Sequence, residues 1–137
     1  HKPLYTDEPG ETTSTERALY PEHRGDLRAW LAPGGTVTLL SGYIHDYRTL
    51  SWGDLSQIWA PSTAFVIDRD GLLYPRYGVR RLGYLRLDLT AEGVSHAFVE
   101  PDGFLNIDLG NWMRSPGGFH ARYASESLRG LALSETT

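Results

Sequence analysis

The stretch Leu39-Leu40-Ser41-Gly42-Tyr43-Ile44-His45-Asp46-Tyr47-Arg48 joins an apolar run to a polar loop that carries one histidine. The run begins at Thr36 and holds β-branched and apolar residues without a polar face. Such a run predicts a strand over residues 36–40 that is buried on both sides, as in a sheet covered by helices. Ser41-Gly42 would end this strand. The loop that follows would then lie at the carboxyl end of the strand, where open α/β sheets bind ligands.

A helix is predicted just before this strand, over residues 21–31. Leu27, Trp30 and Leu31 recur at helical spacing, and Pro21 stands in the first turn, where proline is tolerated. The Ala-Pro-Gly-Gly sequence at 32–35 would stop the helix. The order of helix, glycine turn, strand and polar loop is typical of α/β proteins.

The chain after residue 47 reads as short, mostly antiparallel strands. The segments with this pattern are 48–50, 56–59, 64–67, 83–89 and 95–99. The alternation of polar and apolar residues is clearest from 84 to 89, and the turn at 90–93 predicts a hairpin with the last segment. Residues 101–137 are harder to assign, apart from a short helix predicted over 124–133. The expected fold class is therefore α/β in the broad sense (α+β).

Composition limits the functions that the chain can have. Its 137 residues suit a single domain spanning 1–137, and a net charge of −4 with scattered Lys and Arg predicts no nucleic-acid partner. There is no cysteine, which excludes disulfides and thiol chemistry. No apolar run approaches the ~20 residues of a membrane span, and no signal-peptide pattern is present. We therefore expect a soluble chain without a membrane partner, whose compartment stays open.

A second histidine stands at the start of the sequence, in His1-Lys2-Pro3, where the proline favours an extended chain. This block, together with Gly42-Tyr43-Ile44-His45, resembles the C-terminal half of the calcineurin-like metallophosphoesterases. In that family a histidine follows one strand, often before a proline, and a Gly-His-x-His block follows another. The resemblance covers about residues 1–100, and includes Trp59-Ala60-Pro61-Ser62-Thr63 and the hairpin region.

The resemblance implies part of a four-layer αββα sandwich and hydrolysis of phosphomonoesters or phosphodiesters at a dinuclear metal centre of Zn, Mn or Fe. His1 would bind one ion and His45 the other. Asp46 would orient the imidazole of His45 without binding the metal itself. Alternatively, Asp46 would be a loop carboxylate that pairs with Arg48. The partner implied is a small phosphate ester.

Two departures from the family pattern change the expectation for this chain. Tyr43 occupies the position of the first histidine of the block, and the family's earlier blocks, which supply the other ligands, have no counterpart. The chain is therefore expected to be the C-terminal segment of a metallophosphoesterase-like domain, inactive by itself. Whether it acts as an enzyme stays open.

Two other functions fit the sequence. The first is a β-rich binding or interaction module that has kept the scaffold without the chemistry, which Tyr43 favours. The second is a copper site, in which a free N-terminal His1 binds through its amine and ring nitrogen beside a second histidine. If central strands are missing, an exposed apolar sheet edge would favour self-association.

Overall fold

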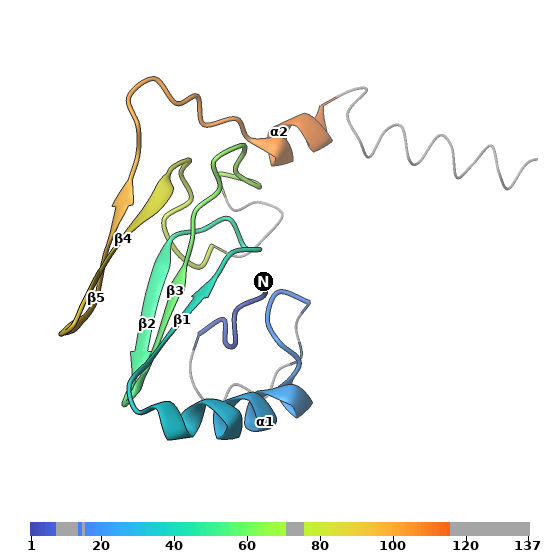
Figure 1. Ribbon diagram of the computed structural model, residues 1–137. Coiled ribbons are helices and arrows are strands. Elements are labelled where there is room, and N and C mark those ends of the chain that lie inside the picture. The colour runs from blue at the N-terminus through green and yellow to red at the C-terminus, as the bar shows by residue number, and fades with distance from the viewer. Residues whose placement is uncertain (8–13, 15, 71–75, 116–137) are drawn as a thin grey trace, which may run out of the picture.

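The computed structural model describes residues 1–7, 14, 16–70 and 76–115. Within these ranges the chain is a mixed α+β structure with two small sheets and few helices (Figure 1). The elements in order are α1 Pro21–Leu31, a 3₁₀ turn Ala32–Gly34, β1 Val37–Ser41, β2 Arg48–Trp52, β3 Leu55–Trp59, β4 Tyr84–Thr90, β5 Gly93–Val99 and α2 Leu109–Arg114. None of the described helices is long and apolar enough to cross a membrane.

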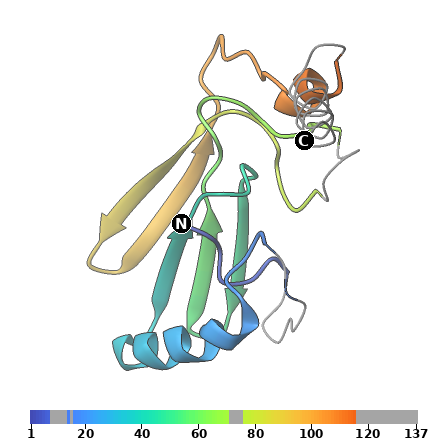
Figure 2. The ribbon, with the colours of Figure 1, turned by 90° about the vertical axis from the view of Figure 1, so that its right-hand side faces the viewer.

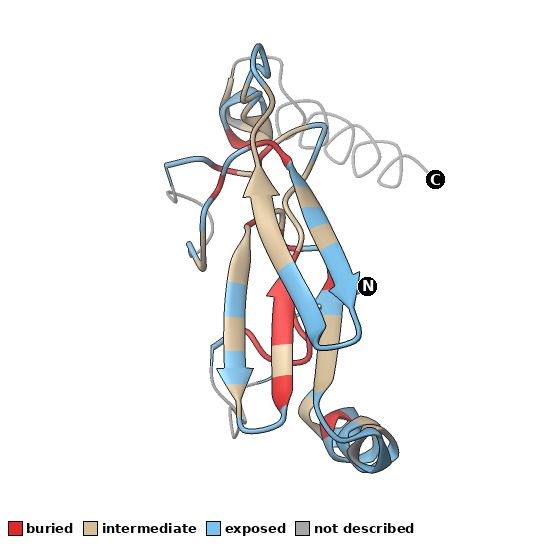
Figure 3. Cartoon of the chain, turned by 60° about the vertical axis from the view of Figure 1, so that its left-hand side comes forward, coloured by how far each residue is buried: buried red, intermediate tan, exposed pale blue. Residues whose placement is uncertain are grey.

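The first sheet has the strand order β1-β3-β2. Strand β3 lies in the middle, parallel to β1 and antiparallel to β2, with Gln57 opposite both Leu39 and Leu50. Because β3 is paired on both edges, it is the most buried strand, and Ile58 and Trp59 are enclosed (Figure 3). The parallel strands β1 and β3 place their carboxyl ends at the same edge of the sheet.

The prediction that the strand after the glycine turn is buried on both sides is wrong. Strand β1 is an edge strand, which pairs only with β3 among the described residues. Leu40 is 50% exposed, and only Ser41 at the end of the strand is buried. An apolar run without a polar face does not reveal how many neighbours the strand has, because that depends on residues elsewhere in the fold.

The segment 64–67, which we predicted to be a strand, is irregular chain with one isolated bridge. Val66 pairs in parallel with Asp108, through Val66 N to Ile107 O at 2.9 Å and Leu109 N to Val66 O at 2.9 Å. The bridge does not extend into a pair of strands. Asp68, which follows this segment, has a positive φ of 56° and turns the chain away.

Helix α1 has the bounds that the sequence predicts, but only part of its apolar face is buried. Leu27 packs against the core cluster formed by Leu4, Tyr5 and Leu55, whereas Trp30 is 78% exposed. Arg24 is buried instead: its Nε donates to Leu19 O at 2.7 Å. The helix lies across the end of the sheet opposite to the carboxyl ends of β1 and β3 (Figures 1 and 2).

The second sheet is the predicted hairpin of β4 and β5, in which Leu85 faces Phe98 and Leu87 faces His96. The hairpin lies beside the first sheet (Figure 2). The Tyr47 ring stacks on Phe98 with 5.3 Å between centroids, and Thr49 Oγ1 lies 3.1 Å from His96 Nε2.

Helix α2 follows the hairpin. The Asp108 side chain caps it by accepting a hydrogen bond from Gly110 N. The helix predicted at 124–133 falls outside the described residues.

A buried glutamine on β3 holds the N-terminal segment against the sheet. Gln57 Oε1 accepts from Leu4 N at 2.6 Å and from Tyr5 N at 3.2 Å, and Gln57 Nε2 donates to Tyr5 O at 2.8 Å. Gln57 is fully buried, so its side-chain amide cannot form hydrogen bonds with water. It forms them instead with the backbone of a segment more than 50 residues away in the sequence.

Replacing this amide by an apolar group of similar size tests its importance. Gln57→Leu leaves the backbone groups of Leu4 and Tyr5 buried without partners, and we expect it to lower the free energy of unfolding by about 3 kcal/mol. Urea denaturation followed by circular dichroism measures this. Ser51→Ala, on the exposed face of β2, should stay within about 0.5 kcal/mol of the wild type. A Gln57→Leu effect no larger than that of Ser51→Ala would contradict the assignment.

Candidate functional site

The loop after β1 has an unusual backbone. Tyr43 and His45 have positive φ values of 69° and 65°, in a region that residues other than glycine rarely adopt. Each such residue costs of order 1 kcal/mol or more, so the surrounding structure must hold the loop in place. Ile44, between them, is 3% exposed and anchors the loop in the interior. Tyr43 and His45, on either side of this anchor, both line the groove described below.

His1 lies against this loop. Its carbonyl oxygen accepts from Gly42 N at 3.1 Å, and its imidazole meets the Tyr43 ring edge to face at 5.6 Å. A Cβ atom on Gly42 would lie only 3.1 Å from Cε1 of His1, so a glycine leaves room for the imidazole. Lys2 adds a cation over the Tyr43 ring, with Nζ 4.9 Å from its centroid.

The imidazole of His45 is oriented by a backbone carbonyl. Nδ1 lies 3.2 Å from Phe65 O, and the His45 and Phe65 ring centroids are 5.0 Å apart. Because a carbonyl oxygen only accepts hydrogen bonds, this contact requires the proton on Nδ1. The neutral ring then carries its lone pair on Nε2, the form in which histidine binds metals.

These side chains share one open groove of about 720 Å³. It lies at the carboxyl ends of β1 and β3, as the sequence predicts for the loop after the first of these strands. The structure thus brings His1, Tyr43 and His45 together. The residues that line the groove are His1, Glu16, Arg17, Tyr43, His45, Phe65, Ile67, Leu109 and Met113.

Asp46, predicted to orient His45, has a different role. Its carboxylate is fully buried and pairs with Arg80, whose Nε is 2.7 Å from Oδ1 and whose Nη2 is 3.2 Å from Oδ2. Oδ2 also accepts from the backbone N–H groups of Tyr77 and Gly78. The alternative pairing with Arg48 is also wrong, because Arg48 binds Asp7 at 2.8 Å. Phe65 O takes the place next to His45 that we had given to Asp46.

The described residues do not contain a complete metal site. No group of three or more His, Asp or Glu side chains in the described ranges could hold a metal ion. Two imidazoles line the groove, and a dinuclear centre needs further ligands, usually including carboxylates. In the described part of the chain, two imidazoles that line one groove are therefore the extent of the agreement with the predicted metal site.

Sequence reasoning missed most of the groove. Arg17 and Glu16 stand in a polar loop whose composition does not indicate that it lines a groove, and Leu109 and Met113 lie in the segment 101–137, which is hard to assign from sequence. Phe65 was predicted to lie in a strand. The one available signal was the Pro61-Ser62-Thr63 turn after β3, which places residues 64–67 at the same end of the sheet as the loop of His45.

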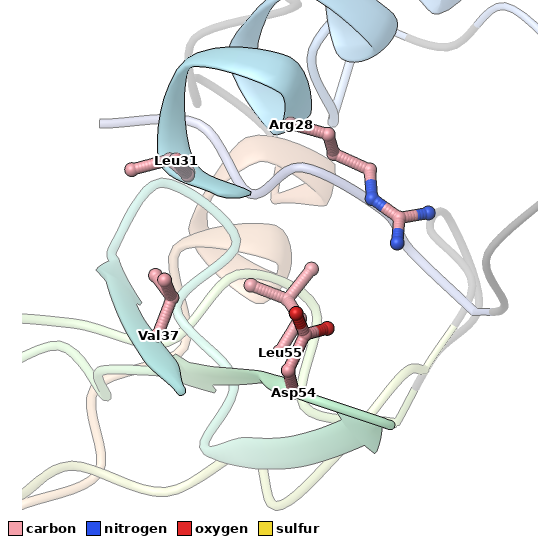
Figure 4. A pocket seen from close by; sticks show the side chains of 5 residues that line it. All are labelled: Arg28, Leu31, Val37, Asp54 and Leu55. Carbon is pink, nitrogen blue, oxygen red and sulfur yellow. The ribbon is translucent and has the colours of Figure 1, made fainter. Parts of the chain in front are cut away.

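A second hollow lies at the opposite end of the sheet, between α1 and the turn before β3 (Figure 4). Its lining residues are Arg28, Leu31, Val37, Asp54 and Leu55. Its volume of about 50 Å³ has room for a few water molecules, well below the several hundred Å³ of typical ligand sites. The groove at His1 and His45 is therefore the better candidate for a functional site.

No protein-family model, curated protein or solved structure matches this chain.

The buried Asp46–Arg80 pair should be critical for stability. Asp46→Asn leaves the Arg80 guanidinium buried without a counter-charge, and we expect it to lower the free energy of unfolding by about 3–5 kcal/mol. The double variant Asp46→Leu/Arg80→Met, which removes both charges, should recover part of this loss. Chemical denaturation of the three proteins measures the coupling.

Asp7→Asn is the matched control, because it breaks the Arg48 ion pair, whose Asp7 side chain is 73% exposed. We expect its effect to stay within about 1 kcal/mol. Equal effects of Asp46→Asn and Asp7→Asn would show that burial adds nothing to the Asp46–Arg80 pair.

Proposed function

We propose that this chain forms part of a metal-dependent phosphoesterase site that hydrolyses phosphomonoesters or phosphodiesters. One observation carries the proposal: His1 and His45, 44 positions apart in the sequence, line the same groove. Each would give one imidazole to a Zn, Mn or Fe ion. A metal pair of this kind lowers the pKa of a bound water and holds the phosphoryl oxygens.

The residues of this chain would prepare the site. Phe65 O fixes the tautomer of His45 so that Nε2 is free to bind a cation, and Gly42 leaves space for the His1 ring. Tyr43 lines the same groove, and its ring contacts His1 and Lys2. A neutral phenol is a weaker ligand than an imidazole, so Tyr43 would reduce the affinity for a metal rather than contribute to it.

The larger fold that we propose is the four-layer αββα sandwich of the calcineurin-like metallophosphoesterases, of which the described residues form one part. The exposed edge of β1 is the place where further strands would join the sheet. Without such strands, the same edge would favour self-association of this chain.

A non-catalytic binding module is the second candidate. It is favoured by Tyr43 and by the lack of a group of three or more metal-binding side chains in the described residues. On this hypothesis the groove would bind a phosphate ester without cleaving it. Turnover of a phosphate ester in the presence of a metal, measured on a longer form of the protein that supplies the remaining ligands, separates the two functions.

Metal titration tests the proposed site. We expect His1→Gln and His45→Gln each to weaken Zn²⁺ or Mn²⁺ binding by about tenfold or more, as loss of a ligand does, whereas Tyr43→His should strengthen it by a similar factor. Isothermal titration calorimetry measures the affinities, and p-nitrophenyl phosphate reports turnover. His23→Gln, on the exposed side of α1, is the control and should change nothing.

Unchanged affinity in both His1→Gln and His45→Gln would rule out a metal site in this groove. Binding of Cu²⁺ alone, lost when one residue is added before His1, would point to the copper site instead. Metal binding without turnover in a longer form that supplies the remaining ligands, including in Tyr43→His, would favour the binding module.

A further inference from the structure

A further hollow lies on the face of the first sheet against which Gln57 holds the N-terminal segment. Leu39 on β1 and Gln57 on β3 stand opposite each other, and both line it. Its volume of about 500 Å³ is within the range of ligand sites, and of its lining residues only His1 also lines the groove of His45. We call this hollow the leucine pocket, because its lining includes Leu4, Leu19, Leu27, Leu39 and Leu40.

The leucine pocket is apolar towards α1. Leu19, Leu27 and Leu39 pack against the core cluster that contains Leu4. Helix α1 lies across the end of the sheet opposite to the carboxyl end of β1 (Figures 1 and 2). The apolar side chains that line the pocket are all aliphatic, so they offer no ring on which an aromatic ligand could stack. Covering such side chains with an alkyl chain removes apolar surface from water, which is favourable.

The polar end of the pocket is at the carboxyl end of β1, where Ser41 closes the strand. Ser41 is 9% exposed, and its hydroxyl is buried without a hydrogen-bond partner in the part of the chain that the structure describes. Because Ser41 follows Leu39 by two residues on β1, both side chains point to the same face of the sheet. A buried hydroxyl without a partner is unfavourable, and an oxygen of a ligand would supply the missing partner.

Lys2 gives the polar end its charge. Gly42 N donates to His1 O at 3.1 Å, which brings the start of the chain next to the end of β1. The Lys2 ammonium lies over the rings of Tyr20 and Tyr43, and within the described ranges no ion pair joins it to a carboxylate. No Asp or Glu is among the residues that line the pocket. The charge of the pocket therefore favours an anion.

We propose that the leucine pocket binds a linear aliphatic carboxylate, with the carboxylate at Lys2 and Ser41 and the alkyl chain among the leucines towards α1. A carboxylate has two oxygens that accept hydrogen bonds, so it can take one from the ammonium and one from the hydroxyl. The ligand lies on a face of the sheet and leaves the backbone groups at the edge of β1 unused. The inference involves neither a metal ion nor a phosphate ester, and is therefore independent of the proposed function.

Titration with short amphiphiles in EDTA tests the ligand class. The probes are octanoate, butanoate and octylammonium, and isothermal titration calorimetry measures their affinities. We expect octanoate to bind about tenfold or more tightly than butanoate, because only the longer chain covers the leucines. Octylammonium has the same chain with the opposite charge, and should bind about tenfold or more weakly than octanoate.

Three variants locate the ligand. Ser41→Ala should weaken octanoate about three- to tenfold, yet it should not lower the denaturation midpoint, because the hydroxyl loses no partner in the ligand-free protein. Lys2→Met should weaken octanoate about tenfold and leave octylammonium no weaker, and Lys2→Arg should keep most of the affinity. Leu40→Gln, at a side chain that is already 50% exposed, should weaken octanoate without unfolding the protein.

Two variants outside the pocket serve as controls. Arg28→Met removes a cation from α1, and Leu105→Gln changes a leucine that is 78% exposed. Neither residue lines the leucine pocket, so neither change should alter the affinity for octanoate.

Octanoate that binds no more tightly than butanoate, or than octylammonium, would overturn the inference. Unchanged octanoate affinity in both Ser41→Ala and Lys2→Met would place the ligand elsewhere and would also overturn it. Sedimentation velocity covers the remaining occupant: a dimer that binds no octanoate would show that a second copy of the chain fills the pocket instead.

Discussion

The groove depends on one buried ion pair. Asp46 follows directly after His45, and its carboxylate joins the loop after β1 to Arg80, which in turn donates through Nη1 to Asp68 O at 2.7 Å. Asp68 N donates to Asp108 Oδ1, which also caps α2. A continuous set of hydrogen bonds therefore runs from the loop of His45 to the helix that carries Met113. Removing the ion pair would detach the loop of His45 from this set, whereas the Val66–Asp108 bridge would still hold the segment 65–67 against the start of α2.

This arrangement explains how the loop keeps its strained backbone. Left-handed conformations at Tyr43 and His45 are unfavourable by themselves, and persist only when the surroundings determine them. Ile44 is buried on one side, and the Asp46 carboxylate fixes the chain immediately beyond. The carbonyl of Phe65 then sets the ring of His45. Local strain is thus balanced by buried polar contacts, each of which has its partners inside the protein.

The elements that the sequence predicted well are those with local signals. Helix α1 has its predicted bounds because proline starts it and Pro-Gly-Gly follows it, and the β4–β5 hairpin follows from alternation and a turn. The exposure of β1 and the partner of Asp46 could not be predicted in this way. Both depend on which segment, distant in the sequence, packs against these residues in the fold. Arg80, for example, is 34 positions from Asp46. In the structure His1, Tyr43 and His45 line one groove. Their assignment to a metal site stays a prediction, and no local signal in the sequence indicated the residues opposite them.

The open edge of β1 and the position of His1 are linked. Val37 N and Ser41 O form hydrogen bonds on the side of β1 that faces β3. Backbone groups alternate in direction along a strand, so those of Thr38 and Leu40 point to the opposite side, as does Gly42 N. His1 O accepts from Gly42 N, and thus continues the sheet one position along this outer edge. The edge that leaves Leu40 half exposed is therefore the same edge that positions the His1 imidazole in the groove. A strand added beside β1 would pair with the backbone groups of Thr38 and Leu40 and would end next to His1, which already occupies Gly42 N.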